Sequence, residues 1–402
     1  MVFNGEDIRK DFPALTHGYA FFDAPGGTQV PEVVAHRVRE TSLKPISYRS
    51  LGSRPGRNAN DVVLEFRGAA ADLLGCSPEG IVYGRSATQL AFDFSRGLAH
   101  QWSRGDNIVL SKLDHDSNIA PWLFAAERCQ VEVRWADFDP TSGELSVAQY
   151  SDLVDDRTRL VAVTAASNLI GTQPDIRGIA DIAHASGAFV YVDGVHHTAH
   201  SAVDLPAMGA DFYVFSPYKL FGPHCAFLAA SPEVLEGIAP DKLRPSPNSV
   251  PERFELGTLP YELLAGTSAM IDYIASLAPR EAGGTRRERI VAAMEAIDEY
   301  ELGLRTRLER GLAKIEQVTL HSRASQRTST LLVSIGGRAP AEVEQRLRDK
   351  DVLSQSGNFY ALEACHRLGL GDVGGLRFGL APYNTEQEID HLLDSLVQAV
   401  RT

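Results

Sequence analysis

Short apolar runs alternate with amphipathic segments through the middle of the chain, and this alternation predicts the class of fold. Residues 176–187 are typical of the amphipathic segments, because Ile179, Ile182 and Ala183 fall on one helical face and Gly187 provides a stop. Alternation of strands and helices favours a mostly parallel sheet with helices on both of its faces. The seven runs that we expect to form this sheet are residues 81–83, 107–110, 131–135, 160–164, 189–192, 212–215 and 225–229.

The pattern changes after a proline-rich loop at residues 241–262, where long charged helical segments follow. A final amphipathic helix is predicted from Asn384 onward, with a capping box at its start. We therefore predict an α/β protein of two domains. The large domain covers residues 20–265, and a smaller α+β domain is built from residues 1–19 and 266–402.

The composition of the 402 residues, 44% hydrophobic and 23% charged, is that of an ordinary soluble globular protein. The net charge of −13 argues against a surface that binds nucleic acid or an anionic membrane. No apolar run approaches the ~18 residues of a membrane span, and the first residues lack the basic and apolar regions of a signal peptide. The four cysteines show no metal-binding spacing, so we expect a reduced, cytoplasmic protein.

A single lysine interrupts two apolar runs in the segment 211–230. Lys219 follows the run that ends at Phe215, and a second run begins at Cys225 after a Gly-Pro turn. Burying an ammonium group is costly unless the group is paired with an acid or loses its charge. The pattern therefore indicates that Lys219 either has a buried acidic partner or is converted into a neutral or delocalised group.

Polar clusters follow several of the predicted strands, where ligands bind in open α/β sheets. The first cluster, residues 83–89, turns from a strand into a helix. Backbone N–H groups at this helix start, together with the hydroxyls of Ser86 and Thr88, would hold a phosphate. The simpler alternative is that Ser86 and Gln89 only form a capping box.

Asp193 ends another apolar strand, and an ionised carboxylate there needs a cationic partner. A protonated ring nitrogen of a cofactor would be such a partner. A metal site made from Asp193, His196, His197 and His200 is a second interpretation. In a third, Asp193 caps a turn and the histidines of the following loop are solvated.

His115 and Asn168 occupy comparable positions after two further strands. A neutral imidazole at His115 can lie flat on an aromatic ring, although surface histidines are commoner. The amide of Asn168 could bind a phenolate oxygen or only complete a turn.

Five spaced motifs, taken in order, connect these clusters to a known family. The chain resembles the class V aminotransferase branch of the fold-type I pyridoxal phosphate (PLP) enzymes, and within it the cysteine desulfurase-like proteins. The resemblance extends from residue 21 to residue 390. It implies the PLP-transferase fold type I, an amino-acid substrate and a homodimer with its active site at the interface. The motifs are "HDSNIAPW", "SNLIGT", "VDGVHH", "DFYVFSPYKLFGP" and the arginine before "PYNTEQEID".

The resemblance assigns the central chemistry to three residues. Lys219 is similar in position to the Schiff-base lysine, which holds PLP as an imine and removes the substrate Cα proton once the substrate amine has displaced it. Asp193 corresponds to the partner of the pyridinium nitrogen, and Arg377 to the arginine that grips the substrate α-carboxylate. An imine would explain how Lys219 fits an apolar wall. Because Arg377 alternates with Leu376 and Phe378, we expect it to point away from their face.

The same resemblance implies further contacts with the cofactor. His115 would stack on the ring, and Asn168 with His196 would face its phenolic oxygen. The segment around Thr258 resembles one that reaches the phosphate of the neighbouring subunit. The phosphate of the same subunit would be held by Ala87, Thr88, Ser216 and Tyr218.

One departure from the family bears directly on the reaction. Cysteine desulfurases carry a sulfur-accepting cysteine on a loop before the substrate arginine, whereas this chain has an Asn-Phe-Tyr run at residues 358–360. Cys365 follows inside a predicted helix. We therefore expect elimination of a β-substituent such as a thiol from a cysteine-type substrate, with release of pyruvate and ammonia; transamination, epimerisation and desulfuration with an external thiol stay open. Residues 46–58 and 354–362 are expected to shape the substrate pocket.

Two other interpretations give different functions. A metal-dependent hydrolase could use His115, Asp193 and the histidines at 196–200. That interpretation leaves Lys219 and Arg377 without roles. A protein of the same fold, retained as a binding or assembly partner, would hold the cofactor without turning over any amino acid.

Overall fold

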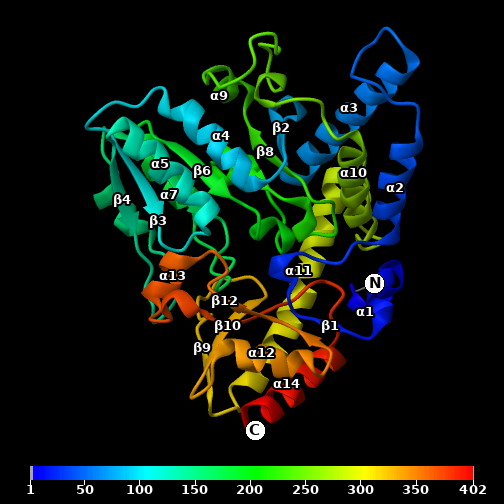
Figure 1. Ribbon diagram of the computed structural model, residues 1–402, viewed down its shortest axis with the longest axis vertical. Coiled ribbons are helices and arrows are strands. Elements are labelled where there is room, and N and C mark those ends of the chain that lie inside the picture. Colours follow the sequence, from blue (N-terminus) through cyan, green and yellow to red (C-terminus); the bar gives the residue numbers. More distant parts are fainter. Residues whose placement is uncertain (1–2, 402) are drawn as a thin grey trace.

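The computed structural model describes residues 3–401, and its larger sheet is the one predicted from the apolar runs (Figure 1). All seven predicted strands are present, each within two residues of its expected limits. The prediction of an α/β fold with a mostly parallel seven-stranded sheet is therefore confirmed. Across the sheet the strands are β2 (Ile81–Gly84), β8 (Ala226–Ala230), β7 (Phe212–Phe215), β6 (Phe189–Asp193), β5 (Thr158–Thr164), β3 (Asn107–Ser111) and β4 (Glu132–Ala136).

The five strands from β7 to β4 run parallel, and β8 runs antiparallel to both β7 and β2. Alternate residues of a strand face opposite sides, so on β6 Val190 and Val192 enter one apolar core and Tyr191 enters the other. Burial on both faces explains why these strands are uninterrupted apolar runs in the sequence. One face is covered by α4 (Ala87–Ala99) and α5 (Ala120–Cys129), and the other by α3 (Arg54–Leu74), α7 (Ile176–Ala185) and α10 (Tyr261–Ser276).

A second, antiparallel sheet lies below the first in Figure 1. Its apolar side chains pack against α11 (Arg286–Leu312), α12 (Pro340–Arg348) and α14 (Glu386–Arg401). The predicted capping box of the last helix is present, because Thr385 Oγ1 accepts from the N–H of Glu388 and the Glu388 carboxylate accepts from the N–H of Thr385. In order, the strands are β12 (Gln355–Gly357), β13 (Gly375–Gly379), β10 (Thr330–Ile335) and β9 (Val318–Leu320).

The N-terminal segment forms a third, two-stranded sheet and contacts the four-stranded one. β1 (Ala20–Phe21) pairs with β11 (Val352–Leu353), and Asp23 then forms a bridge with Gly379 at the end of β13. The limits of the two predicted domains stay a prediction, and residues 1, 2 and 402 of the predicted small domain lie outside the described residues. The remaining helices are α1 (Gly5–Ile8), α2 (Glu32–Leu43), α6 (Tyr150–Leu153), α8 (Leu205–Met208), α9 (Pro232–Glu236) and α13 (Leu362–Arg367).

Two features of the described chain bear on where it works. No helix within residues 3–401 has both the length and the apolar character needed to cross a membrane. All four cysteines are free thiols. Cys225 and Cys365 are buried, whereas Cys76 and Cys129 are half-buried.

Candidate active site

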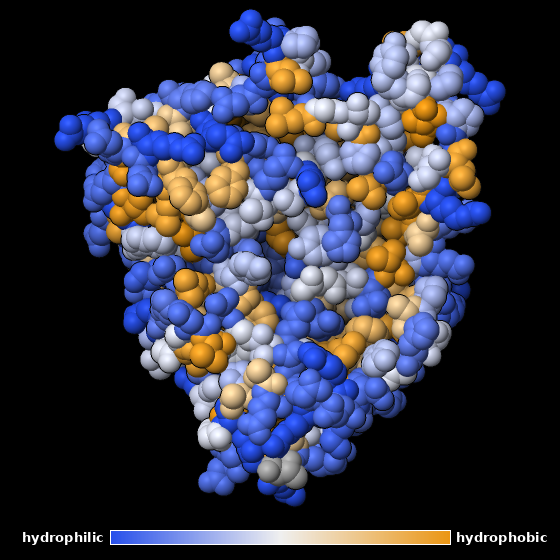
Figure 2. Space-filling view, viewed as in Figure 1, coloured by the Kyte–Doolittle hydropathy of each residue, from blue (hydrophilic) through white to orange (hydrophobic). Residues whose placement is uncertain are grey.

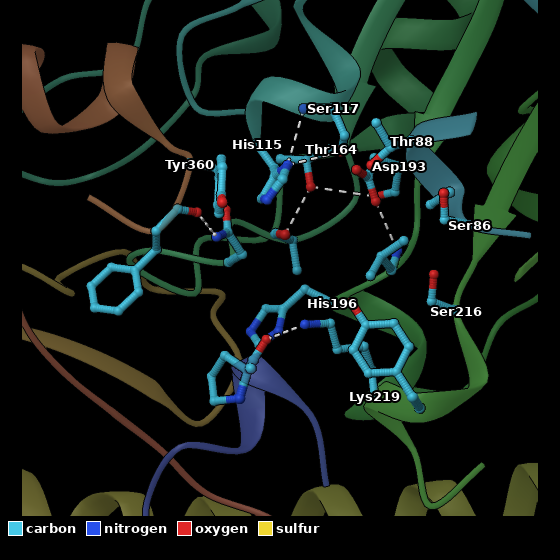
Figure 3. A pocket seen from close by; sticks show the side chains of 18 of the residues that line it. Ser86, Thr88, His115, Ser117, Thr164, Asp193, His196, Ser216, Lys219 and Tyr360 are labelled. Atoms are coloured by element: carbon cyan, nitrogen blue, oxygen red, sulfur yellow. Dashed lines mark hydrogen bonds between the residues drawn. The ribbon is translucent and has the colours of Figure 1, made fainter. Parts of the chain in front are cut away.

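A cavity of about 320 Å³ lies where the strands β5, β6 and β7 end and helix α4 begins (Figure 3). This volume is within the range of about 300–1,000 Å³ that is typical of sites for cofactors and small molecules. All the predicted site residues except Thr258 line the cavity, although they are far apart in the sequence. They are Ala87, Thr88, His115, Asn168, Asp193, His196, Ser216, Tyr218, Lys219 and Arg377.

Lys219 lies at the end of a short 3-10 helix (Pro217–Lys219) that follows β7. Its Nζ donates a hydrogen bond to the carbonyl oxygen of Pro25 and lies 4.6 Å from the centre of the Tyr218 ring. Burial and the positive charge of Arg377 lower its pKa to about 7, and the attraction of Asp193 only partly offsets this. At neutral pH a large share of this lysine is therefore an uncharged, nucleophilic amine and not a salt-bridged ammonium.

Asp193, the last residue of β6, is buried. One of its carboxylate oxygens accepts a hydrogen bond from the backbone N–H of Val195 at 2.9 Å, so the turn-capping contact is present. Burial nevertheless raises the pKa of Asp193 to about 6, because desolvation outweighs both that hydrogen bond and the attraction of Lys219. A carboxyl group in this condition is stabilised as the anion by any cation brought next to it.

The neighbouring histidines do not form the metal site that was one interpretation of the sequence. His196 Nε2 lies 3.0 Å from each of two threonine hydroxyls at the start of β10. His197 Nδ1 contacts the hydroxyl of Tyr213 at 3.0 Å, and His200 Nδ1 contacts the carboxylate of Glu301 at 2.7 Å. Each ring thus has a different partner, and residues 3–401 contain no group of three or more His, Cys, Asp or Glu residues that could hold a metal ion. The interpretation as a metal hydrolase is not supported, because the nitrogen atoms of these rings have separate partners, even though the rings of His196 and His200 pack edge to face with centres 4.8 Å apart.

His115 is an uncharged ring in the cavity wall. Its Nδ1 accepts a hydrogen bond from the backbone N–H of Ser117 at 3.0 Å. Burial and the charges of Lys219 and Arg377 lower its pKa to about 4. The ring centre lies 5.5 Å from that of Tyr360, with the two planes inclined by 32°. A neutral imidazole held in this way is suited to stacking on a planar ligand, and the stacking on the cofactor that the family resemblance implies stays a prediction.

Asn168 leaves a buried acceptor without a partner. Its Nδ2 donates to the carbonyl oxygen of Phe359 at 3.0 Å, while its Oδ1 is buried and accepts no hydrogen bond from residues 3–401. Because buried polar groups are normally paired, this oxygen marks a place where a ligand would supply a donor. One N–H of the same amide is also left for a ligand acceptor.

The start of α4 provides backbone donors to the cavity. Ser86 is the N-cap residue, and its Oγ accepts a hydrogen bond from the N–H of Gln89 at 3.1 Å. This is the first of the two contacts that make up a capping box. The Gln89 side chain instead accepts from the N–H of Arg85, which leaves the capping box incomplete. Since the first N–H groups of a helix have no partner within the helix, those of Ala87 and Thr88 suit an anion.

Arg377 enters the cavity from β13 and is only 3% exposed. Its Nη1 donates to the backbone carbonyl of Asn168 at 2.7 Å, and its Nη2 donates to Oε1 of Gln355 at 3.1 Å. The guanidinium carbon lies 3.8 Å from the centre of the Phe359 ring. Burial lowers the pKa of Arg377 to about 9 against the attraction of Asp23. The residue is a buried cation directed into the cavity, and not part of a surface ion pair.

Comparison with known proteins shows the family of this chain. The family model of the class V aminotransferases matches residues 20–392. The chain belongs to this family. Its relatives include an aminotransferase-like protein from Gibberella zeae, 31% identical over 98% of both chains, and a cysteine desulfurase from Klebsiella pneumoniae, 28% identical over 98% of both chains. The apo structure of a cysteine desulfurase from Thermococcus onnurineus NA1 superposes with a TM-score of 0.89, at 26% identity over 98% of both chains. The resemblance to cysteine desulfurase-like proteins is thus confirmed.

This class V family member has no cysteine among the described residues that line its cavity. Cys365 lies in α13, where its side chain is buried and its Sγ contacts the carbonyl oxygen of Asn358 at 3.8 Å. Burial raises the pKa of this thiol to about 11. A buried thiol in this state is a poor nucleophile, and the cavity wall before it is formed by Phe359 and Tyr360.

Two sequence predictions about the pocket have different outcomes in this class V chain. Thr258 is exposed and lies outside the cavity. It lines a surface groove to which Ser86 and Thr88 also contribute. Residues 46–58 do not line the cavity of the described chain, and their part in the pocket of a dimer stays a prediction. The segment 354–362 does contribute, through Gln355 and the two aromatic residues that follow it.

The contribution of the N-terminal segment was missed from the sequence. Pro25 accepts the hydrogen bond from Lys219, and Gly26 lies so close to Gln355 that a Cβ atom there would be 2.9 Å from its Nε2. The run "APGG" at residues 24–27 is the available signal, because Pro and Gly directly after a short strand favour a tight turn or a close backbone approach.

Proposed function

We propose that this class V enzyme binds PLP at Lys219 and eliminates a thiol from the β-carbon of a cysteine-type α-amino acid. The observation that carries the proposal is the meeting of a partly uncharged lysine, a buried carboxyl group and a buried arginine in one cavity lined by no cysteine of residues 3–401. The names of the relatives support it in part, since they include a cysteine desulfurase and an aminotransferase-like protein.

The residues present fit PLP, as three features of the cavity indicate. Asn168 has one amide N–H left for the phenolic oxygen, the pKa of Asp193 is raised in a way that a cationic ring nitrogen would relieve, and the start of α4 offers free N–H groups. When bound, PLP withdraws electron density from the Cα atom of the substrate. The ring would be held by His115, Asp193, Asn168 and His196, and the phosphate by Ala87, Thr88, Ser216 and Tyr218.

The side chains of the chain itself would bind the substrate and move its proton. Arg377 uses two of its five N–H groups in contacts with the protein, which leaves donors for the substrate α-carboxylate. Lys219, with a pKa of about 7, can accept the proton from Cα at neutral pH. His115 is uncharged at that pH and so does not compete with Arg377 for the carboxylate.

The sulfur would leave as a free thiol and not as an enzyme persulfide. The net reaction converts R–S–CH2–CH(NH3⁺)–COO⁻ and water into R–SH, pyruvate and NH4⁺. The Cβ–S bond breaks and the sulfur takes up a proton. Transfer of sulfur to the enzyme would instead require a thiolate that reaches the substrate, and Cys365 is buried with a raised pKa.

A product analysis tests this reaction. The PLP-loaded protein is incubated with L-cysteine and a series of S-substituted L-cysteines, and pyruvate, alanine, sulfide and keto acids are measured separately. We expect pyruvate, ammonium and thiol in equal amounts, and none of them with Lys219→Ala. Alanine with sulfide in the presence of an external thiol would mean desulfuration, other keto acids would mean transamination, and a D-amino acid would mean epimerisation. Turnover of none of these compounds would contradict the proposal and favour a binding role.

We also propose that the enzyme is a cytoplasmic homodimer. Thr258 lies outside the cavity of its own chain and is exposed next to the start of α4, as expected of a residue that serves another subunit. Figure 2 shows apolar side chains along the side of the molecule that carries α2, and Val33, Leu43 and Tyr48 are exposed there. Free thiols suit a reducing compartment. Sedimentation of the protein at twice the mass of the chain would support the dimer.

A further inference from the structure

The segment 358–361 has an unusual backbone at the edge of the cavity. Phe359 and Tyr360 have φ values of 56° and 57°, and they are the only adjacent pair of non-glycine residues with positive φ within residues 3–401. Aromatic residues rarely adopt this left-handed conformation, because the Cβ atom crowds the backbone. Such strain persists only where the surrounding structure holds it in place.

Four hydrogen bonds hold the strained pair. Within the segment, Asn358 accepts from the N–H of Tyr360 at 3.1 Å through its side chain and from the N–H of Ala361 at 2.8 Å through its carbonyl. Two further bonds tie the segment to loops of the large sheet. The carbonyl of Phe359 accepts from Asn168 at 3.0 Å, and that of Tyr360 accepts from the N–H of Asp116 at 2.6 Å. The segment is therefore fixed across the cavity from both sides.

The left-handed backbone at Phe359 determines where the ring of this residue lies. The Phe359 ring covers a face of the Arg377 guanidinium at 3.8 Å, while Asn168 and Gln355 accept hydrogen bonds from its edge. Contacts to the face and the edge together fix the plane of the guanidinium and leave its other N–H groups for a ligand. The Tyr360 ring lies against His115 and is largely exposed, so it takes no part in this arrangement.

We propose that Phe359 is a positioning residue for the α-carboxylate: its ring holds and desolvates the Arg377 guanidinium so that the carboxylate meets it in one orientation. The inference rests on the proposed amino-acid site but not on what happens to the substrate afterwards. The strained backbone follows from this role, because a right-handed residue at this position would carry its ring elsewhere.

The test measures recognition of the carboxylate without turnover. The PLP-loaded protein is titrated with L-alanine and with L-alaninamide, which lack a β-leaving group, and the change in cofactor absorbance gives a dissociation constant for each. We expect the wild-type protein to prefer the carboxylate strongly. In Phe359→Leu, which keeps an apolar side chain but removes the aromatic face, this preference should fall about tenfold, whereas Phe359→Tyr should retain it.

Two controls separate positioning from general damage to the site. Phe124→Leu makes the same change at an exposed phenylalanine outside the cavity, and its preference for the carboxylate should stay within twofold of the wild type. In the apoprotein, phenylglyoxal should modify Arg377 faster in Phe359→Leu than in the wild type, because one face of the guanidinium is uncovered. This readout needs no cofactor.

Two results would overturn the inference. An unchanged preference in Phe359→Leu, or an equal loss in Phe124→Leu, would show that the Phe359 ring does not position Arg377. A wild-type holoprotein that responds to neither alanine nor alaninamide would contradict the proposed amino-acid site itself, and the inference with it.

Discussion

Lys219 and Arg377 are two cations in the walls of the same cavity, and burial lowers the pKa of both, but only the lysine loses much of its charge at neutral pH. Lys219 has one carbonyl acceptor, and burial lowers its pKa to about 7. Arg377 has two acceptors and an aromatic face, and burial lowers its pKa to about 9, which still leaves it charged at neutral pH. Similar surroundings therefore produce a neutral amine from the lysine but leave the guanidinium charged, because guanidinium is far more basic and more weakly hydrated. Lys219 is therefore suited to act as a base, and Arg377 to bind the substrate carboxylate.

The largest effect should follow from removing the base. We expect Lys219→Ala to lower turnover of any amino-acid substrate by roughly a thousandfold or more, since a positioned base contributes about 10²–10⁴ to the rate. Circular dichroism should show an unchanged fold. Lys112→Ala is a matched control, because Lys112 pairs with Asp137 outside the cavity and its loss should leave turnover intact. Residual turnover within tenfold of the wild type would show that another group removes the proton.

Removing the anchor should have a smaller effect of a different kind. In Arg377→Gln we expect KM for the amino acid to rise about 10–100-fold while kcat changes less, since a charge-assisted hydrogen bond contributes about 1.5–3 kcal/mol. Steady-state kinetics on the PLP-loaded protein measure both values. Arg307→Gln, which removes an exposed ion pair with Asp390, should change neither. A KM equal to that of the wild type would place the carboxylate elsewhere.

The smallest effect concerns the pKa of the lysine itself. Below about pH 7 Lys219 is mostly protonated, and above it mostly neutral, so its reaction with an amine reagent should increase as the pH rises through 7. Arg377→Gln removes a nearby positive charge and should shift this midpoint upward, whereas Asp193→Asn removes a negative charge and should shift it downward. Both shifts should be modest, because burial is the main cause of the low pKa. Labelling of the apoprotein followed by mass spectrometry measures them, and a midpoint near the ordinary lysine value would contradict the comparison.

The local sequence pattern was sufficient to predict most of the strands and the polar residues at their ends that line the cavity. The strand runs are apolar on both faces, so β5, β6 and β7 and the polar residues at their ends could be located before any contact was known. The capping pair Thr385 and Glu388 was equally local. The same local reasoning failed for His196, His197 and His200, whose ring nitrogens have separate hydrogen-bond partners despite the short spacing of the residues.

Long-range contacts account for what the sequence could not predict. Arg377 donates a hydrogen bond to the carbonyl of Asn168, which is 209 residues away in the sequence. Lys219 donates one to the carbonyl of Pro25, which is 194 residues away. Backbone carbonyls carry no residue-specific signal, so neither contact has a sequence pattern. The left-handed Phe359 is a similar case, because aromatic residues do not predict positive φ and only the assembled cavity holds that conformation.

The attachment of PLP to Lys219 is the central claim, and one measurement tests it most directly. The protein is incubated with PLP, reduced with borohydride and digested, and the modified peptide is identified by mass spectrometry. We expect a pyridoxyl group on the peptide that contains Lys219, and its loss in Lys219→Ala. Modification of a different lysine, or of none, would contradict it.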